Sequence, residues 1–451
     1  MKITSKIEDV INPSIIAPGS RIYAAGNAAT PQKSLQQMAR DTGIKDVELL
    51  SVLLLGDVEE VFSREACQRI THRVIFNGHH SRAAVNQGWA RYQLIHLSDI
   101  PKQVREFLKP DIALLQVSGP DNGGNYSLGT TVEGVLAAVK SARENHGIVI
   151  AERNARMPFV LGTTIHESQI DYLLDVDYDL PVSPVKKPDE RATRIARIIA
   201  EKYIEDGCTL QYGIGEVPEA VTQAILDKGV RDLGIRTELF ADAMRLLVEK
   251  GVVTNRYLNN PFSIASLFLS GNRGGYHWLD YNSSVQSRAS DRTNNIINIA
   301  RHPKMIAINS AIGLDLHGNI WADSLDARKI YSGVGGQSDF LRGAYFSPGG
   351  VPIIAMKSTT VKGVSKILDK CPEGITTTAI AADPVIIVTE HGTFDPRGLS
   401  ITEHAVGIAH LADPKVRDQL LRHIYDSGQF HNPSQNMIHG VPKGFTPHDR
   451  I

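Results

Sequence analysis

The chain has 451 residues, of which 42% are hydrophobic and 22% charged, and its formal net charge is −1. This composition is typical of a globular protein, and the length predicts two or more domains that each bury their own core. A net charge so close to zero gives no electrostatic case for a nucleic-acid or membrane partner, and we expect neither.

The cysteines and the start of the chain indicate a cytoplasmic protein. Cys67, Cys208 and Cys371 lie far apart without a C-x-x-C pair, so neither a zinc ribbon nor a disulfide framework is indicated. Isolated cysteines fit a reducing compartment. Residues 1–9 lack the apolar segment of a signal peptide, and the longest apolar runs are too short to span a bilayer.

Short apolar runs alternate with longer amphipathic stretches along the chain. Continuous apolar runs suit strands that are buried on both faces, as in a parallel sheet. The residues 131–144 place valine and leucine on one helical face. The alternation predicts an α/β architecture. The predicted strands comprise residues 112–117, 148–151, 351–356 and 385–388.

One segment, residues 178–188, has the composition of an exposed linker, with three prolines and the adjacent pair Lys186 and Lys187. An amphipathic pattern predicts a helix immediately after it. We therefore predict an N-terminal α/β domain over residues 1–183 and a C-terminal α/β domain over residues 190–451.

Two glycine clusters follow predicted strands. Gly213-Ile214-Gly215 lies between a strand and a helix start, and its backbone N–H groups can bind a phosphate or an oxyanion. It lacks the third glycine of a dinucleotide-binding fingerprint, which argues against an NAD site. The second cluster, Gly333, Gly335 and Gly336, permits close backbone approach. It is either a tight connection or a loop lining a thioester or phosphate site.

Glu238 follows the first glycine turn by about one βα unit, at a predicted strand-to-helix junction. A carboxylate opposite backbone N–H donors can act as a covalent nucleophile, because those donors stabilise the oxyanion that its attack on a carbonyl creates. Its immediate neighbourhood alone favours a different role, that of a helix N-terminal glutamate stabilised by the helix dipole.

Two further loops follow predicted strands. Ser118, Pro120 and Asp121 form a candidate substrate loop at the carboxyl end of a strand, where open α/β sheets bind ligands, or else a plain connection. Asn309 either hydrogen-bonds a substrate carbonyl or starts a turn. The histidines show no zinc-ligand spacing, and we expect no metal.

Taken in order, these motifs resemble the acetyl-CoA hydrolase/transferase family, and within it the butyrate and 4-hydroxybutyrate CoA-transferases. The resemblance runs from about residue 20 to about residue 425. Several ordered motifs are more specific than any one of them. The motifs are Ser118–Asp121, Tyr126–Gly129, Asn154–Pro158, Gly213–Gly215, Thr237–Asp242, Asn309–Ala311, Gly333–Asp339, Glu390–Gly392 and Arg397-Gly398.

The resemblance implies two open-sheet α/β domains of the CoA-transferase type with the active site between them. It implies that Glu238 is the nucleophile, that Asn309 lies near the reacting carbonyl, and that coenzyme A is a substrate with no metal or redox cofactor. It also implies a homo-oligomer, dimeric or higher. The implied oxyanion or CoA contacts are Gly213, Ile214, Gly215, Gly333, Gly335 and Gly336.

The expected function is CoA transfer between a short-chain acyl-CoA and a carboxylic acid such as acetate, by a ping-pong reaction through a glutamyl-CoA thioester on Glu238. An acyl-CoA hydrolase, a non-catalytic ligand-binding protein and, more weakly, a sugar-phosphate isomerase remain open. The chain departs from the family pattern at Gly119, His404 and the segments 28–31 and 271–284, which we expect to shape the acyl pocket.

Overall fold

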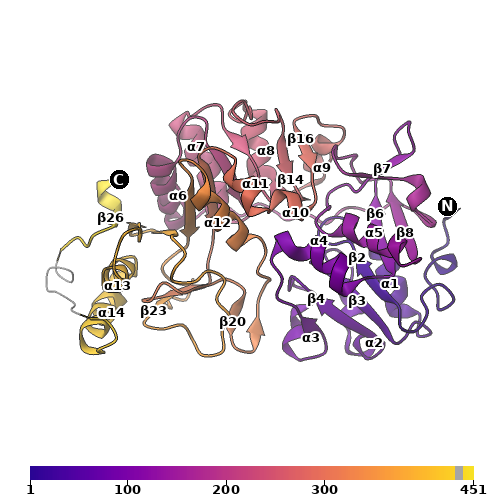
Figure 1. Cartoon of the computed structure of the whole chain (residues 1–451), viewed down its shortest axis with the longest axis horizontal. Helices are drawn as coiled ribbons and strands as arrows, with labels where there is room; N and C mark the ends of the chain where they lie inside the picture. Colours follow the sequence, from indigo (N-terminus) through magenta and orange to yellow (C-terminus); the bar gives the residue numbers. More distant parts are fainter. Residues whose placement is uncertain (432–439) are drawn as a thin grey trace.

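The computed structural model describes residues 1–431 and 440–451 and consists of two α/β lobes that lie side by side (Figure 1). Each lobe is built on one open sheet. The predicted α/β class with two open sheets is therefore confirmed.

The N-terminal lobe contains an eight-stranded, entirely parallel sheet. In spatial order its strands are β1 (Lys2–Thr4), β10 (Tyr172–Val176), β8 (Ile148–Asn154), β6 (Ile112–Val117), β2 (Arg21–Ala24), β3 (Val47–Ser51), β4 (Ile70–Val74) and β5 (Arg91–Tyr92). Its α-helices are α1 (Gln32–Arg40), α2 (Arg64–Arg69), α3 (Arg82–Asn86), α4 (Ile100–Gln103) and α5 (Val135–Glu144). The strands β7 (Asn125–Ser127) and β9 (Thr164–His166) form a separate antiparallel pair.

The C-terminal lobe contains a seven-stranded sheet that is parallel from β12 to β24 and antiparallel from there to β26. In spatial order its strands are β12 (Gly234–Ile235), β11 (Thr209–Tyr212), β17 (Met305–Asn309), β22 (Val351–Ala355), β24 (Ile386–Thr389), β25 (Gly392–Phe394) and β26 (Phe445–Pro447). The longer helices are α6 (Glu190–Tyr203), α7 (Glu216–Lys228), α8 (Asp242–Glu249), α9 (Arg273–Leu279), α12 (Gln337–Phe346), α13 (Ile401–His410) and α14 (Pro414–Asp426), and the shorter ones are α10 (Ser290–Thr293) and α11 (Ile296–Ala300).

Short strands outside the two main sheets connect these elements. Strand β13 (Leu239–Ala241) pairs in parallel with β15 (Leu267–Leu269), and β14 (Ser263–Ala265) pairs in parallel with β16 (Val285–Ser287), so the two pairs alternate along the chain. The others are β18 (Gly313–Asp315), β19 (Ile320–Trp321), β20 (Ser324–Asp326), β21 (Lys329–Ile330) and β23 (Ile367–Leu368).

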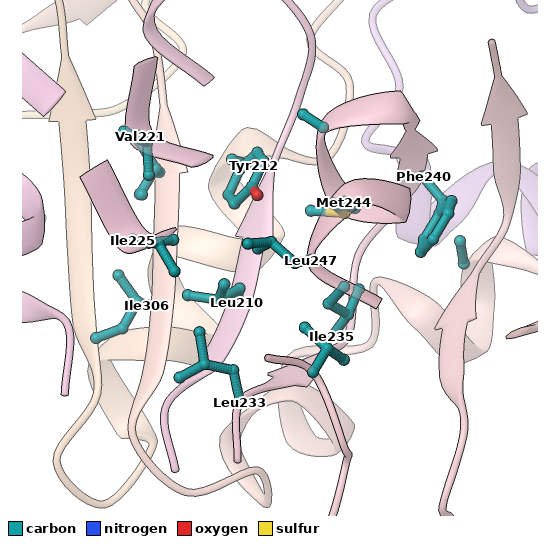
Figure 2. Packing of buried hydrophobic residues seen from close by; sticks show 14 of the residues in the cluster. Leu210, Tyr212, Val221, Ile225, Leu233, Ile235, Phe240, Met244, Leu247 and Ile306 are labelled. Carbon is teal, nitrogen blue, oxygen red and sulfur yellow. The ribbon is translucent and has the colours of Figure 1, made fainter. Parts of the chain in front are cut away.

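In the C-terminal lobe, the sheet packs against α6, α7 and α8 around an apolar core (Figure 2). Leu210 and Ile306 come from adjacent parallel strands, Ile225 comes from α7, and Leu247 comes from α8. All four side chains are buried, so their apolar surface is removed from water, which is the main term that stabilises such a lobe. This core fixes the strand ends and helix starts at which the site is built.

The predicted elements agree closely with the structure where apolar runs define them. Residues 112–117 are strand β6, and every one of its six residues is buried. The helix expected over residues 131–144 begins only at Val135. The backbone before it is used differently, since Thr131 forms a β-bridge with Leu267 of the other lobe and Val132 N–H donates to Ser266 O at 2.9 Å.

The connection between the lobes runs from the end of β10 to the start of α6, where the Asp189 carboxylate caps the helix by accepting a hydrogen bond from Ala192 N–H at 2.8 Å. We retain residues 1–183 and 190–451 as the proposed domains. Over residues 1–431 and 440–451, no helix has both the length and the apolar character needed to cross a bilayer.

Candidate active site

Glu238 lies between β12 and β13, and not at the start of a helix. Asp242 is the first residue of α8, so the interpretation of Glu238 as a helix N-terminal residue is wrong. The main-chain carbonyl of Glu238 accepts hydrogen bonds from Ser266 N–H at 3.0 Å and Leu267 N–H at 2.8 Å. These two bonds hold its backbone in a fixed position.

The Glu238 carboxylate is held by a side chain that the sequence did not indicate. Asn294 Nδ2 donates to Glu238 Oε2 at 3.0 Å and lies 3.4 Å from Asp339 Oδ2. Asp339 accepts hydrogen bonds from Ser98 N–H at 3.1 Å and Ser98 Oγ at 2.8 Å. Because Ser98 belongs to the N-terminal lobe, the two lobes together fix the carboxylate.

Burial controls the protonation of both carboxyl groups. Burial raises the pKa of Glu238 to about 7; the Asn294 hydrogen bond opposes this rise, and the nearby charge of Asp339 adds to it. Burial likewise raises the pKa of Asp339 to about 6. Glu238 is therefore more basic than an ordinary glutamate and still ionises near neutral pH, which suits a carboxylate nucleophile.

Gly336 is the member of the second glycine cluster that faces Glu238. A Cβ at this position would lie 1.9 Å from Glu238 Oε2 and 2.0 Å from Asn294 Nδ2, so no other residue fits here without displacing them. Gly333 and Gly335 lie instead against Phe76 of the N-terminal lobe, and Leu97 N–H donates to Gly335 O at 3.0 Å.

Glu238 lines a cavity of about 560 Å³ together with Asn309 and the first glycine turn, Gly213, Ile214 and Gly215. Gly215 has a φ of 125°, a conformation open to glycine, and precedes the first residue of α7. The lining residues all fall between 186 and 366, so the cavity wall belongs to the linker and the C-terminal lobe.

Asn309 ends strand β17 and reaches the cavity beside Gln211 of the neighbouring strand β11. The two side-chain amides pair with each other, at 3.1 Å from Asn309 Nδ2 to Gln211 Oε1 and 3.4 Å from Gln211 Nε2 to Asn309 Oδ1. This pairing orients both amides at the carboxyl edge of the sheet. Sequence reasoning identified Asn309 and missed Gln211.

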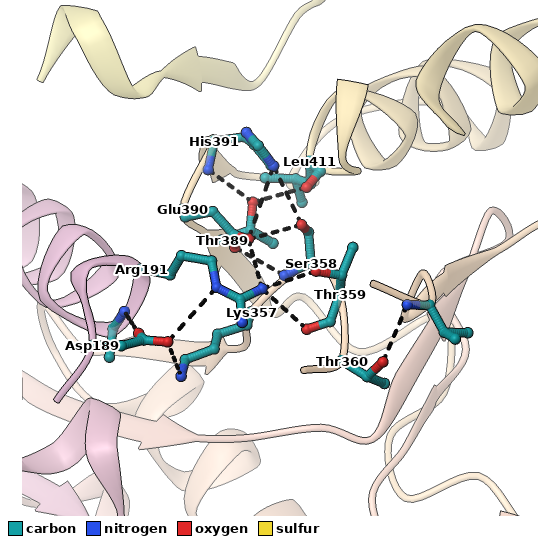
Figure 3. Close-up of polar contacts among 12 residues, drawn as sticks. Asp189, Arg191, Lys357, Ser358, Thr359, Thr360, Thr389, Glu390, His391 and Leu411 are labelled. Carbon is teal, nitrogen blue, oxygen red and sulfur yellow. Dashed lines mark hydrogen bonds and ion pairs between the residues drawn. The ribbon is translucent and has the colours of Figure 1, made fainter. Parts of the chain in front are cut away.

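Four cationic side chains also line the cavity, and the sequence did not mark them as a group: Lys186, Arg191, Lys357 and Lys366. Figure 3 shows the network around two of them. Arg191 Nη1 donates to Thr359 Oγ1 at 2.8 Å, and Lys357 Nζ lies 2.8 Å from Asp189 Oδ2. Only the Pro- and Lys-rich linker offered a signal, through Lys186.

Lys357 and Arg191 are bound to carboxylates that limit their movement. Lys357 also pairs with Glu216 at the start of α7. Arg191 Nη1 lies 3.8 Å from Glu390 Oε1, and Glu390 accepts from Ser358 N–H at 2.8 Å. The cavity wall therefore presents cations held in place by carboxylates, in addition to the Glu238 carboxylate.

The candidate substrate loop lies elsewhere. Ser118 Oγ accepts from Ser127 N–H at 3.0 Å, and Asp121 Oδ1 accepts from Gly123 N–H at 2.8 Å and Asn125 N–H at 2.9 Å. Ser118, Pro120 and Asp121 do not line the cavity that contains Glu238. Their assignment to a substrate loop stays a prediction.

The segments that depart from the family pattern do not line this cavity, and their part in shaping the acyl pocket stays a prediction. Gly271 lines a separate cavity of about 240 Å³ that shares Lys186, Ile214 and Gly215 with the first. His404 packs against Phe394, with ring centroids 5.4 Å apart. Over residues 1–431 and 440–451, no three histidine, cysteine or acidic side chains gather as a metal-binding group.

Comparison with known proteins places this geometry in a family. The acetyl-CoA hydrolase/transferase N-terminal domain profile matches residues 3–186, and the C-terminal domain profile matches residues 271–424. The 4-hydroxybutyrate coenzyme A transferase of Clostridium kluyveri is 35% identical over 384 residues, which cover 83% of this chain and 86% of that protein.

Two further proteins are similar over most of the chain. The succinyl-CoA:acetate/propanoyl-CoA:succinate CoA transferase of Fasciola hepatica is 33% identical over 418 residues, covering 90% of this chain and 85% of that protein. The crystal structure of RipA from Yersinia pestis is 30% identical with a TM-score of 0.86, covering 95% of this chain and 98% of that chain. The fold, the carboxylate site and these relatives together show that the chain belongs to the acetyl-CoA hydrolase/transferase family.

Proposed function

We propose that this protein is a CoA-transferase that moves CoA between a short-chain acyl-CoA and a carboxylic acid such as acetate, with Glu238 as the covalent nucleophile. The observation that carries the proposal is the placement of Glu238, whose carboxylate lines a cavity beside a turn of backbone N–H groups. The names of the relatives, which include several CoA-transferases, support the same reaction class.

The first half of the reaction loads CoA onto the protein. The Glu238 carboxylate attacks the thioester carbonyl, the carbon–sulfur bond breaks, and an acyl-glutamyl anhydride forms with release of CoA thiolate. The thiolate then attacks the glutamyl carbonyl, which expels the acid and leaves a glutamyl-CoA thioester. Two steps replace one difficult displacement.

The second half reverses these steps with the incoming acid, whose carboxylate attacks the glutamyl-CoA thioester. Each tetrahedral intermediate carries an oxyanion, and the donors proposed for it are the N–H groups of Ile214 and Gly336 and the Asn309 amide. Removing one such donor typically costs about 10²–10³ in rate. Arg191 and Lys357 would oppose the phosphate charges of CoA from the cavity wall.

The experiment that tests the proposal looks for the covalent intermediate. The protein is incubated with acetyl-CoA, trapped with borohydride or hydroxylamine, and examined by peptide mass spectrometry for modification at Glu238. Glu238→Ala is expected to abolish both the adduct and turnover, and Glu238→Asp to lose most turnover because its carboxylate is one methylene shorter. Turnover that survives Glu238→Ala would contradict a nucleophilic role.

An acyl-CoA hydrolase is the second candidate, because the family contains both activities. The two activities are distinguished by whether they need an acceptor acid. With butyryl-CoA, a transferase forms acetyl-CoA only when acetate is added, whereas a hydrolase releases free CoA without it. A ligand-binding protein without catalysis would give no adduct in the first experiment.

We also propose a cytoplasmic homo-oligomer, dimeric or higher, acting without metal or redox cofactor. Light scattering on the purified protein measures the assembly, and turnover after treatment with a chelator tests the metal. A monomeric mass at working concentration, or turnover lost to the chelator and restored by a metal, would contradict the corresponding part.

A further inference from the structure

Lys366 is one of the cationic residues that line the Glu238 cavity, and hydrogen bonds fix its backbone. It precedes strand β23, and its backbone is bonded on both sides, with Lys366 N–H donating to Ser358 O at 2.8 Å and Lys366 O accepting from Leu314 N–H at 3.0 Å. The side chain is partly buried and lines the cavity. Its position is therefore set by β-structure and not by a mobile loop.

The Lys366 amine is bonded to the segment that follows strand β17, the strand that ends at Asn309. Lys366 Nζ donates to Ala311 O at 2.7 Å, two residues beyond Asn309 at the end of strand β17. Asn309, Glu238 and Lys366 line the same cavity. An acyl-CoA bound in this cavity would therefore share one enclosed space with the Lys366 side chain.

No carboxylate within residues 1–431 and 440–451 lies within 4.0 Å of the Lys366 amine, whereas Lys357 in the same cavity pairs with Asp189 and Glu216. The surroundings of Lys366 instead include the cations Lys357 and Arg191. Burial lowers the pKa of Lys366 to about 8, although the charge of Glu390 opposes this. About a tenth of such an amine is neutral at pH 7, compared with well under a thousandth of an ordinary lysine.

We propose that Lys366 is a site of self-acylation by the acyl-CoA substrate. The neutral amine attacks the thioester carbonyl, a carbon–nitrogen bond forms, the carbon–sulfur bond breaks, and the amine proton passes to the departing CoA thiolate. The products are an Nε-acyl-lysine and free CoA. The inference rests on the proposed function, because it requires acyl-CoA to occupy the Glu238 cavity.

The test uses isotopically labelled acetyl-CoA with the intact protein, followed by peptide mass spectrometry at pH values from 6.5 to 9.5. Lys362 is the matched control, since it lies exposed four residues away, and Lys357 is the control for an ion-paired amine in the same cavity. We expect label on Lys366 to exceed that on either control several-fold at pH 7. Its rate should rise about tenfold to pH 9 and then level off, whereas an ordinary lysine would still be rising.

Two features separate this reaction from surface chemistry and from the Glu238 adduct. Excess free CoA should protect Lys366 and leave Lys362 unchanged, and the lysine amide should survive the hydroxylamine that cleaves the Glu238 thioester. A Glu238 adduct without preferential Lys366 labelling would overturn this inference and leave the proposed function intact. Absence of both modifications would overturn both, and labelling of Lys366 that free CoA does not reduce would also contradict the inference.

Discussion

Asn294 shows at the scale of single residues what the sequence conceals. It lies 56 residues from Glu238 and orients the carboxylate that the motifs had identified. Glu238 was recognisable because it belongs to an ordered series of motifs. Asn294 directly follows the short helix α10, where no local pattern marks it, and its role comes only from folding, which places it between Glu238 and Asp339.

The charge of Asp339 yields a prediction about pH dependence. This charge raises the pKa of Glu238, so Asp339→Asn should lower it. Since the proposed nucleophile reacts in its ionised form, kcat/KM should fall as pH drops through the Glu238 pKa, which is raised to about 7 in the unmodified protein, and the break should move to lower pH in the variant.

A pH profile of kcat/KM between pH 5 and 9 measures this shift. Asp326→Asn is the control, because Asp326 pairs with Lys329 in the β20–β21 pair and does not line the cavity. A break that stays in place or moves upward in Asp339→Asn would refute electrostatic coupling between the two carboxyl groups.

Glu133 yields a prediction about stability. It is buried, Tyr23 Oη donates to its Oε1 at 3.1 Å, and its Oε2 has no partner among the described residues. Burial raises its pKa to about 8 from 4.5. The folded protein thus keeps a proton that the unfolded chain releases above about pH 4.5, so this group's contribution to stability is lost as pH rises towards 8.

Glu133→Gln should remove this loss of stability at high pH, because the glutamine amide has the shape of the carboxyl group and does not ionise. Calorimetric melting temperatures at pH 5 and pH 8 are the measurement, and the difference between them should shrink in the variant. Glu65→Gln, at an exposed helix position, provides the comparison. An unchanged difference for Glu133→Gln would show that this carboxyl ionises at its ordinary pH.

At the scale of elements, apolar runs predicted strands well and boundaries between short elements poorly. Strand β6 was placed correctly because a run of six buried residues has one sensible conformation. Glu238 was expected next to a helix, but the three-residue strand β13 intervenes. That strand exists because it pairs with β15, 26 or more residues later in the chain, which no local pattern indicates.

The start of α12 yields a prediction about catalysis. Gly336→Ala would place a methyl group 1.9 Å from Glu238 Oε2, although the φ of −102° suits any residue. The carboxylate must therefore move while the backbone stays, and turnover should fall by about 10²-fold or more with little change in melting temperature.

Steady-state kinetics and calorimetry on the same preparation separate the two effects. Gly119→Ala is the comparison for melting temperature, since an added Cβ there meets nothing within 4 Å. If Gly336→Ala retained full activity, the close approach of residue 336 would not determine the position of the Glu238 carboxylate.

At the scale of the whole molecule, the two-lobe plan followed from the linker composition and the family motifs, but the division of labour between the lobes did not. The cavity wall lies within residues 186–366. The N-terminal lobe contributes through hydrogen bonds to residues near Glu238, because Ser98 donates to Asp339 and Leu97 N–H donates to Gly335 O. Contacts between the lobes depend on the shapes of the two folded surfaces, and local patterns in a single sequence do not reveal those shapes.

The linker yields a prediction about access. Lys186 and Lys187 are exposed, and Lys186 lines the cavity. Limited trypsin digestion should cut early after Lys186, because exposed loops are the preferred sites of nicking and the bond after Lys187 is blocked by Pro188. Bound acetyl-CoA should slow this cleavage, and gel electrophoresis with N-terminal sequencing measures its rate. A cleavage rate that acetyl-CoA does not change would contradict binding of acetyl-CoA beside Lys186.

Because Lys186 forms part of the cavity wall and Asp189 pairs with Lys357, the boundary between lobes is itself a piece of the site. A chimera that joins the N-terminal lobe of one relative to the C-terminal lobe of another is therefore best spliced before residue 183. A junction placed after α6 begins would take Lys186 and Asp189 from the other relative. Such a hybrid would keep Glu238, the proposed nucleophile, but part of its cavity wall would come from a different protein.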